Sequence, residues 1–473
     1  MFCIRFQPSK CLTLLKERAG DIFDRVRKYS TADEVEVLFY GGKSALTRFA
    51  NNTIHQNVAE ENYGVSVRTA FDGRTARATT NKFDEESLRR VVQASEALAK
   101  VQQPDSDLLP MPNAGEGARA TQSLPSRHFE QTAAVTPEQR AHSVSKIVSI
   151  ATNHKLTAAG IFSSSESVEG IFNSRGLSEW HTQTSSEISI TMLAADSSGW
   201  QKTNSPDVAN LNAQALAETA AKKGLESAHP REIPAGKYTV ILEPAAVLDM
   251  VGFMFFDFGG LAILDQRSFL NNRVGTKLFG DNINICDDVV HPLQSGAPFD
   301  GEGVWRHRVS LVENGVVKRL VYARATAEKM RSSEYKDKVG IIEPTGHGFP
   351  IPNEMGEAPM NIVFAAPKDS KTIDQMVAST EHGVLVTRLW YIREVDPYEK
   401  ILTGMTRDGT FYVQDGKIRH GIRNFRFNES LIHMLSNVEE MGTPVRASGE
   451  ESFDMVVPAM KVKEFNFTEV TKF

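Results

Sequence analysis

Arg388 is the side chain of this sequence whose chemistry most needs an explanation. It interrupts the otherwise apolar run 384–391, and a guanidinium in such surroundings requires a carboxylate or carbonyl partner. Because buried charges are normally paired, one interpretation is an internal salt bridge to Glu394 or Asp396. The other interpretation is that Arg388 helps to line a groove that contacts another molecule, and the sequence alone leaves both open.

Five further polar residues lie in turns that could contact a bound chain. Asn173 and Arg175 belong to an Asn-Ser-Arg-Gly turn, and they could join such a groove by contacting the backbone or terminus of a peptide. Asp300 and Glu302 alternate with glycines, which let the backbone approach another chain closely, although a simple acidic turn explains them equally well. Asp408 lies in a Thr-Arg-Asp-Gly turn that could face a partner. We assign no catalytic residue, and the candidate binding residues are Asn173, Arg175, Asp300, Glu302, Arg388 and Asp408.

The twelve histidines do not have the spacing of a metal site. His291, His307, His347 and His382 lie in the C-terminal half, but none is three or four residues from another. A lone histidine in a loop usually contacts solvent or the backbone. Asp257 and Asp265 could lie near one another, but a satisfied surface or cap role is expected for them instead of a catalytic one.

The charge balance and hydropathy argue against several classes of protein. The chain has 59 acidic and 53 basic side chains, a net charge of −6 and no long run of like charge, which disfavours nucleic-acid binding. The longest apolar segment, 247–264, is interrupted by Asp249, Asp257 and a pair of adjacent glycines, which disfavours a membrane span. Residues 1–20 carry several charges and do not resemble a secretion signal. We therefore expect a cytoplasmic protein with no membrane or nucleic-acid partner.

The stretch 381–418 predicts the centre of an antiparallel sheet. Apolar residues occupy both faces of the run 384–391, so this strand is expected to be buried on both sides. Asp408-Gly409 and Asp415-Gly416 have the composition of tight hairpin turns, which need positive φ, and they flank the short strand 410–413. This sheet should be the scaffold of the C-terminal half.

Helices and strands alternate in the N-terminal half. Helical periodicity predicts an amphipathic helix over 9–29. Capping residues at Asp84 and Thr136 predict helices that run to about Lys100 and His154.

Strand patterns occur between these helices. The alternating segment 34–40 predicts a strand that ends at Gly41-Gly42. Segments 158–165, 167–173 and 187–195 predict strands of a second sheet layer.

A chain of 473 residues is expected to form two domains. The proline-containing segment 229–236 marks the predicted boundary. The prediction is an α/β N-terminal domain over 1–232 and a mainly antiparallel, β-rich C-terminal domain over 233–473, so the fold class is α+β. Within the first domain, the polar and proline-rich segment 102–128 predicts a flexible connection.

Five short motifs occur in a specific order along the chain. They are Phe172–Gly176 (FNSRG), Phe299–Gly303 (FDGEG), Leu311–Gly315 (LVENG), Leu385–Tyr391 (LVTRLWY) and Leu402–Phe411 (LTGMTRDGTF). Together they resemble the TldD/PmbA family, whose second branch is called TldE and whose older name is modulator of DNA gyrase. The resemblance implies an α/β domain followed by a β-rich domain. It also implies a relation to TldD-type zinc-dependent peptidases, which act with a TldE-type partner on unfolded polypeptides.

The resemblance also implies where a metal site would lie. Active members carry HExxxH on a helix and a later cysteine, so that two histidines bind zinc and the glutamate acts as a base on the bound water. The motif would fall near Gly252–Asp257, which reads GFMFFD here, on a widely apolar helix predicted from Pro244 to Gly259-Gly260. No cysteine follows Cys286. We therefore expect this chain to bind no cofactor, and we expect the zinc in a TldD-like partner.

Two functions from different classes remain open at this point. In the first, the chain is a TldE-like subunit of a two-component zinc peptidase that degrades or processes unfolded peptides, and it is inactive without its TldD-like partner. In the second, it is a non-catalytic homodimer that holds peptides or a client protein without cutting them.

Overall fold

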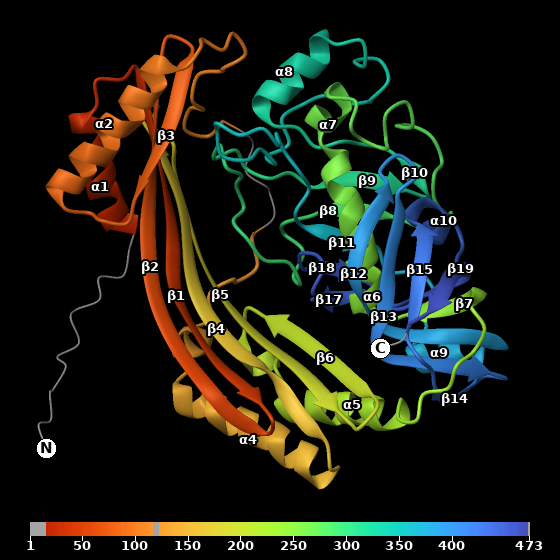
Figure 1. The fold of residues 1–473 in the computed structure, drawn as a ribbon. Helices are drawn as coiled ribbons and strands as arrows, with labels where there is room; N and C mark the ends of the chain where they lie inside the picture. Colours follow the sequence, from red (N-terminus) through yellow and green to blue (C-terminus); the bar gives the residue numbers. More distant parts are fainter. Residues whose placement is uncertain (1–15, 117–122, 472–473) are drawn as a thin grey trace, which may run out of the picture.

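The computed structural model describes residues 16–116 and 123–471, and its fold is α+β, as predicted (Figure 1). The N-terminal half contains a six-stranded sheet in the order β3-β2-β1-β4-β5-β6, in which every neighbouring pair is antiparallel. Its strands are β1 (Glu34–Ala50), β2 (Thr53–Phe71), β3 (Arg74–Thr80), β4 (Thr157–Asn173), β5 (Ser178–Leu193) and β6 (Ser198–Ser205).

The strands of this sheet are longer than the sequence patterns predicted. The prediction that the first strand ends at Gly41-Gly42 was wrong, because β1 continues through both glycines to Ala50. A Cβ on Gly41 would lie 2.1 Å from the carbonyl oxygen of Asn62, and one on Gly42 would lie 2.0 Å from that of Glu166. The glycines therefore let the backbones of β2 and β4 approach β1 closely instead of ending it.

The predicted second sheet layer was also wrong. Segments 158–165 and 167–173 form one continuous strand, β4, and β4 pairs with β1 in the same sheet. The alternation of apolar and polar residues identified the strands but did not define which strands are neighbours, because any half-buried strand has this pattern.

Helices cover one face of the long sheet at its two ends (Figure 1). At one end α1 (Lys16–Tyr29) and α2 (Glu85–Val101) bury an apolar core with β1 and β2. At the other end α4 (Pro137–Asn153) and α5 (Ala213–Glu226) pack on β4 and β5. The capped starts of α2 and α4 are confirmed, whereas residues 9–15 of the first predicted helix lie outside the described residues.

The capping box of α4 provides a direct test of local stability. The backbone N–H of Gln139 donates to the Thr136 hydroxyl, and the Thr136 N–H donates to the Gln139 side chain. We expect Thr136→Ala to lower the free energy of unfolding by about 1 kcal/mol in chemical denaturation, because it leaves a helix N–H without its acceptor. Thr152→Ala, on the exposed face of the same helix, should cost nothing, since alanine is the better helix former. Equal losses in the two variants would contradict this assignment.

The connection predicted over 102–128 contains no regular helix or strand among its described residues. Even so, it makes specific contacts with both halves of the molecule. The N–H of Met111 donates to Glu34, and the carbonyl of Pro110 accepts from Arg324 at 2.9 Å. The buried Arg127 guanidinium donates to the Val289 carbonyl at 2.6 Å. The described parts of the segment therefore contact both halves of the molecule, and the predicted flexibility of the connection stays a prediction.

The C-terminal half is built on a sheet that closes on itself. Its order is β12-β7-β19-β15-β13-β14, and β12 also pairs with β13. The strands are β7 (Gly236–Leu242), β12 (His382–Asp396), β13 (Ile401–Gln414), β14 (Lys417–Gly421), β15 (Phe425–Ser430) and β19 (Met460–Val470), with β16 (Val438–Met441) alongside β19. Val384 and Val386 of β12 face the main core and Leu385 faces a smaller one, so the prediction of a strand buried on both sides is confirmed.

One of the two predicted hairpin turns is a turn and the other is not. Asp415-Gly416 joins β13 to β14, but Asp408-Gly409 lies inside β13, so that part of the prediction was wrong. Both Asp408 and Gly409 have positive φ, and the pairing of β12 with β13 shifts register opposite them. The same dipeptide therefore forms a bulge within a continuous strand.

The wide apolar helix predicted after Pro244 is three shorter segments. They are α6 (Pro244–Val251), a 3₁₀ segment over Gly252–Phe258, and α7 (Gly260–Leu264). Most of their side chains are fully buried in the main core, as expected. Within the described residues, none of the helices is both long and apolar enough to cross a membrane.

A third sheet and three short helices complete this half. The sheet has the order β10-β9-β8-β11-β18-β17, formed by β8 (Ile285–Asp287), β9 (Val309–Glu313), β10 (Val316–Val317), β11 (Ile362–Phe364), β17 (Val445–Ala447) and β18 (Met455–Val457). The helices are α8 (Arg324–Ser332), α9 (Ile373–Ala378) and α10 (Leu431–Ser436), and a four-residue helix, α3 (Glu130–Ala133), follows the connection of the first half. The domain division at 232/233 stays a prediction.

Candidate functional site

A cavity of about 630 Å³ lies between the long N-terminal sheet and loops of the C-terminal half. One wall comes from β1 and β4, and the other comes from residues 299–301, Arg306 and 348–350. We refer to it as the inter-lobe cavity. Cavities of this size, with apolar walls and few charged groups, are typical of ligand sites.

The register of β1 and β4 explains which side chains reach this cavity. Tyr40 lies opposite Glu169, and Leu38 lies opposite Ile171. Because side chains alternate across a strand, these four share one face, while Phe39 packs on the other face in the core under α1 and α2. The ring of Tyr40 covers Gly64, where a Cβ would lie only 2.7 Å from it. The sheet therefore presents two apolar side chains, one aromatic ring and one carboxylate to the cavity.

Asp300 is fixed in the opposite wall by backbone donors. Its carboxylate accepts from the N–H groups of Glu302 at 2.9 Å, Val304 at 3.0 Å and Gly348 at 2.7 Å. Burial raises the pKa of Asp300, and the nearby Arg306 guanidinium and these amides oppose that rise. The carboxylate thus holds the loop together, which supports the acidic-turn interpretation of this motif.

Glu302 lies behind Asp300 and is almost completely buried. It accepts from the backbone N–H of Arg324 at 3.3 Å, and the Arg324 guanidinium lies 3.7 Å away. Burial, and then the charge of Asp300, raise the pKa of Glu302 to about 7. Asp300 and Glu302 are therefore brought together by the structure, as members of one buried charged group.

A histidine–carboxylate pair stands beside Arg306. His347 Nε2 lies 3.0 Å from Asp287 Oδ1, and both side chains are fully buried. Burial opposes ionisation of Asp287, but His347 and Arg306 keep its pKa below the usual value. Arg306 Nε and Nη1 are also buried and have no hydrogen-bond partner among the described residues. One guanidinium therefore attracts Asp287 and Asp300 without being held by either.

Two family models match this chain over most of its length. The PmbA/TldA metallopeptidase C-terminal domain matches residues 235–469, and the PmbA/TldA metallopeptidase domain 1 matches residues 35–99. The chain belongs to the PmbA/TldD metallopeptidase family.

Individual relatives agree with this membership. Metalloprotease PmbA of Escherichia coli O157:H7 is 20% identical over 95% of this chain and 96% of its own length. The metalloprotease PmbA homolog of Haemophilus influenzae is 21% identical over 90% of both chains. The solved structure of TldE from Thermococcus kodakarensis covers 95% of this chain and all of its own, with a TM-score of 0.82 and 18% identity, which shows a shared fold.

The zinc of the PmbA/TldD family does not fit the segment Gly252–Asp257. The only ligand-type side chain there, Asp257, has its Oδ2 atom 2.6 Å from the ammonium of Lys400. Asp257 is therefore satisfied, but in a buried ion pair and not in the surface or cap role that was expected. Over residues 16–116 and 123–471, no three His, Cys, Asp or Glu side chains are close enough together to hold a metal ion.

The same segment nevertheless borders the inter-lobe cavity. Phe256 is 41% exposed, and its ring stacks on that of Phe349, which lines the cavity, with centroids 6.4 Å apart. The segment where the metal motif was expected thus makes an aromatic contact beside the cavity.

Asn173 and Arg175 do not line the inter-lobe cavity. The Asn173 amide donates to the Pro112 carbonyl at 2.8 Å, and its oxygen accepts from the backbone of its own turn. Arg175 donates to Asn113 and forms a salt bridge to Glu34 at 3.1 Å. These contacts hold the connecting segment against the end of the long sheet, and a binding role for the two residues stays a prediction.

Arg388 does form an internal salt bridge, but the predicted partners were wrong. Its guanidinium binds the carboxylate of Asp408, the next residue after its cross-strand neighbour in β13. Glu394 is engaged by Lys400 at 2.7 Å, and Asp396 accepts from the backbone of its own turn.

The structure also separates Arg388 from Asn173. Arg388 lies over the ring of Trp200 in β6. Trp200 pairs with Thr191 of β5, and Thr191 pairs with Ala159 of β4, so Arg388 is near the Ala159 end of β4. Asn173 is therefore roughly 45 Å further along the sheet. The groove that these residues were expected to form together is not present. Asp408 instead borders another hollow, of about 590 Å³, beside Asp196, His229 and Arg423.

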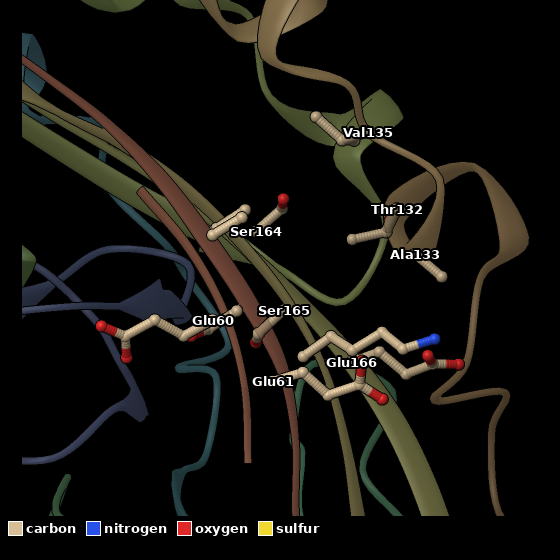
Figure 2. Close-up of a pocket in the computed structure, with 12 residues that line it drawn as sticks. Glu60, Glu61, Thr132, Ala133, Val135, Ser164, Ser165 and Glu166 are labelled. Atoms are coloured by element: carbon tan, nitrogen blue, oxygen red, sulfur yellow. The ribbon is translucent and has the colours of Figure 1, made fainter. Parts of the chain in front are cut away.

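A smaller hollow of about 310 Å³ lies on the long sheet beside α3 (Figure 2). Glu60, Glu61 and Glu166 border it, and Figure 2 shows Glu60 directed away from the other two. Glu166 already has a partner, because His128 Nε2 lies 2.7 Å from it. This hollow shares no residue with the inter-lobe cavity.

Sequence reasoning missed Tyr40, Glu169 and Arg306, which the structure brings together in one cavity. Tyr40 and Glu169 occupy ordinary positions in alternating strands, and Arg306 lies in a loop. No spacing connects them, since they meet only through the β1–β4 register and the packing of two lobes. As a set, they can bind a ligand, and the accessible carboxylate of Glu169 is their most available polar group.

Proposed function

We propose that this chain is a TldE-like subunit of a two-component zinc metallopeptidase, in which it binds unfolded peptide and a TldD-like partner supplies the metal and HExxxH. The observation that carries the proposal is the state of segment Gly252–Asp257. Its phenylalanines pack in the core or against Phe349, and its one carboxylate is bound by Lys400. These side chains are engaged in packing and in an ion pair, which supports a partner chain as the source of the metal chemistry.

The inter-lobe cavity supports a peptide-binding role for such a subunit. It is large enough for one or two side chains of a peptide, and it adjoins the segment where the family places its metal. An unfolded substrate can present a single extended strand to such a cavity, whereas a folded protein cannot. The expected compartment is the cytoplasm.

The test is reconstitution with a TldD-like chain from the same organism. Alone, this chain is expected to cleave no unfolded reporter polypeptide and to contain no stoichiometric zinc by elemental analysis. Cleavage should appear when the partner is added, and it should exceed the activity of the partner alone. A partner whose HExxxH glutamate is replaced by glutamine must abolish cleavage in the mixture, which assigns the chemistry to the partner.

Two outcomes would contradict the proposal. Stoichiometric zinc in the isolated chain would show that a metal site had been overlooked. If mixing produced neither a complex nor cleavage while the isolated chain still bound unfolded peptides, the homodimeric binding protein would be the better description.

A further inference from the structure

Glu169 differs from the other charged groups of the inter-lobe cavity. Asp300 is satisfied by three backbone donors, whereas Glu169 has no hydrogen-bond or salt-bridge partner among the described residues. It is also exposed, and it stands on the cavity face of β4 opposite Tyr40. The nearest cation is Arg306, which attracts the carboxylate from a distance without forming an ion pair. Glu169 is therefore an acceptor available to a ligand.

The charge around Glu169 favours a cation as that ligand. Arg306 is the only basic side chain in the cavity wall that the structure describes, and it is shared among Glu169, Asp287 and Asp300. An anion would have to compete with these three carboxylates for one guanidinium. A cation would instead pair with a carboxylate that has no partner, and such charge-assisted hydrogen bonds are the strong ones.

The walls of the cavity define what the cation is attached to. Tyr40, Leu38 and Ile171 surround Glu169 on the sheet, and Phe299 and Phe349 face them. Tyr40 is 45% exposed, and its ring leans over Gly64 of β2, so it leaves the space beside Glu169 open to a ligand. A lysine side chain matches this arrangement, because four methylene groups can pass along apolar walls before the ammonium reaches the carboxylate.

We propose that the inter-lobe cavity binds a primary ammonium group of an unfolded peptide, with Glu169 accepting its hydrogen bonds. A lysine side chain carries this group, and a free peptide amino terminus carries the same chemistry. The inference rests on the proposed function, in that the ligand is a peptide, and it specifies the residue that the peptide must present.

The experiment measures peptide binding to the full chain by fluorescence anisotropy. The probe is an N-acetylated peptide with a dye at its C-terminus and one lysine among apolar residues, and the reference peptide has norleucine in place of lysine. Norleucine keeps the apolar arm and removes the charge. The lysine peptide is expected to bind about tenfold more tightly or better, which is the size of one charge-assisted hydrogen bond.

Glu169→Gln should remove this preference, so that the lysine peptide binds the variant no more tightly than the norleucine peptide does. The matched control is Glu60→Gln, an exposed glutamate of the same sheet outside the cavity, which should keep the full preference. Circular dichroism and the melting temperature check that both variants fold. A preference that survives Glu169→Gln would overturn the proposal. So would equal affinity for the norleucine peptide, the lysine peptide and a norleucine peptide with a free amino terminus.

A third peptide identifies the source of the ammonium. It has norleucine at the lysine position and a free amino terminus, so binding tighter than that of the lysine peptide would assign the site to peptide termini. The result is also separate from that of the reconstitution. Cleavage with the partner but no charge preference would refute this inference alone, whereas a Glu169-dependent preference without cleavage would refute the subunit role.

Discussion

Replacing Asp408 by asparagine is expected to lower the free energy of unfolding by about 3–5 kcal/mol, which is the cost of leaving one partner of a buried ion pair alone. Arg388 Nε donates to Asp408 Oδ2 at 2.7 Å, and both side chains are less than a tenth exposed. The Arg388 guanidinium also lies over the rings of Trp200 and Trp390, 4.7 and 5.3 Å from their centroids. Without the carboxylate, this charge remains buried between two indoles and two lobes.

The neighbouring Asp415 provides a matched control. Asp408 and Asp415 both have positive φ, at 54° and 50°, and asparagine tolerates that conformation, so backbone strain is the same in both variants. Asp415 pairs with Arg419 at 2.9 Å, but on the surface, so Asp415→Asn should cost less than about 1 kcal/mol. Chemical denaturation followed by tryptophan fluorescence measures both. Losses of the same small size would show that the buried pair contributes no more than the exposed one.

Local features of the fold were predictable because their causes are local. Asp84 and Thr136 start helices since their side chains accept from backbone N–H groups three residues ahead, and both contacts are observed. Asp415-Gly416 forms a turn because it supplies positive φ between two alternating strands. In each case the interactions that determine the local structure lie within a few consecutive residues.

The errors share a different cause. Asp408-Gly409 satisfies the same conformational requirement as a hairpin turn, but a bulge needs positive φ as well, and only pairing with β12 distinguishes the two. The Gly41-Gly42 pair has the composition of a strand end, but the two glycines lie within β1 and allow the backbones of β2 and β4 to approach it closely. Sequence patterns show that a special backbone is required and do not show which neighbour requires it.

The candidate site was the least predictable part. Asp300 and Glu302 were chosen for their glycines. Asp300 does line the inter-lobe cavity, but it is held by backbone amides, and Glu302 lies behind it near Arg324. Glu169, the available carboxylate, comes from an unremarkable strand. Partners of a buried or binding charge are set by register between strands and by docking of lobes, and neither is encoded in a short motif.

Asp249 of α6 is a second buried charge beside Arg388, and its state is set by pH. Its Oδ1 accepts from the backbone of Glu450 and Glu451 at 3.3 Å each, while its Oδ2 is buried without a hydrogen-bond partner. Burial raises the pKa of Asp249 from 3.8 to about 7, and the two amides and Arg388 only partly oppose this. The folded protein therefore holds a proton that the unfolded chain releases near pH 4.

Protonation of Asp249 makes the free energy of unfolding depend on pH. Between about pH 4 and pH 7 the folded state binds one proton more than the unfolded state at this group, so stability falls as pH rises through this window and is constant above it. Asp249→Asn removes this dependence, because an amide does not titrate. Between pH 5 and pH 8 the wild type is expected to lose roughly 3 kcal/mol of free energy of unfolding through Asp249, and the variant should not show this loss, so it gains that amount relative to the wild type.

Chemical denaturation of the wild type and of Asp249→Asn at pH 5 and pH 8 measures this gain. The change in free energy of unfolding between the two pH values is compared for the two proteins, so the contributions of other titrating groups cancel unless those groups contact Asp249. Asp337→Asn, at an exposed position, should show no gain between the two pH values. A gain for Asp249→Asn no larger than that of Asp337→Asn would mean that Asp249 is ionised in the folded protein at pH 5, with Arg388 as its partner.

In that case Arg388 would hold two carboxylates, and Asp408→Asn would cost less than 3 kcal/mol because Asp249 would neutralise the guanidinium in its place. The two experiments therefore constrain each other, since one guanidinium connects both carboxylates at the junction of the lobes.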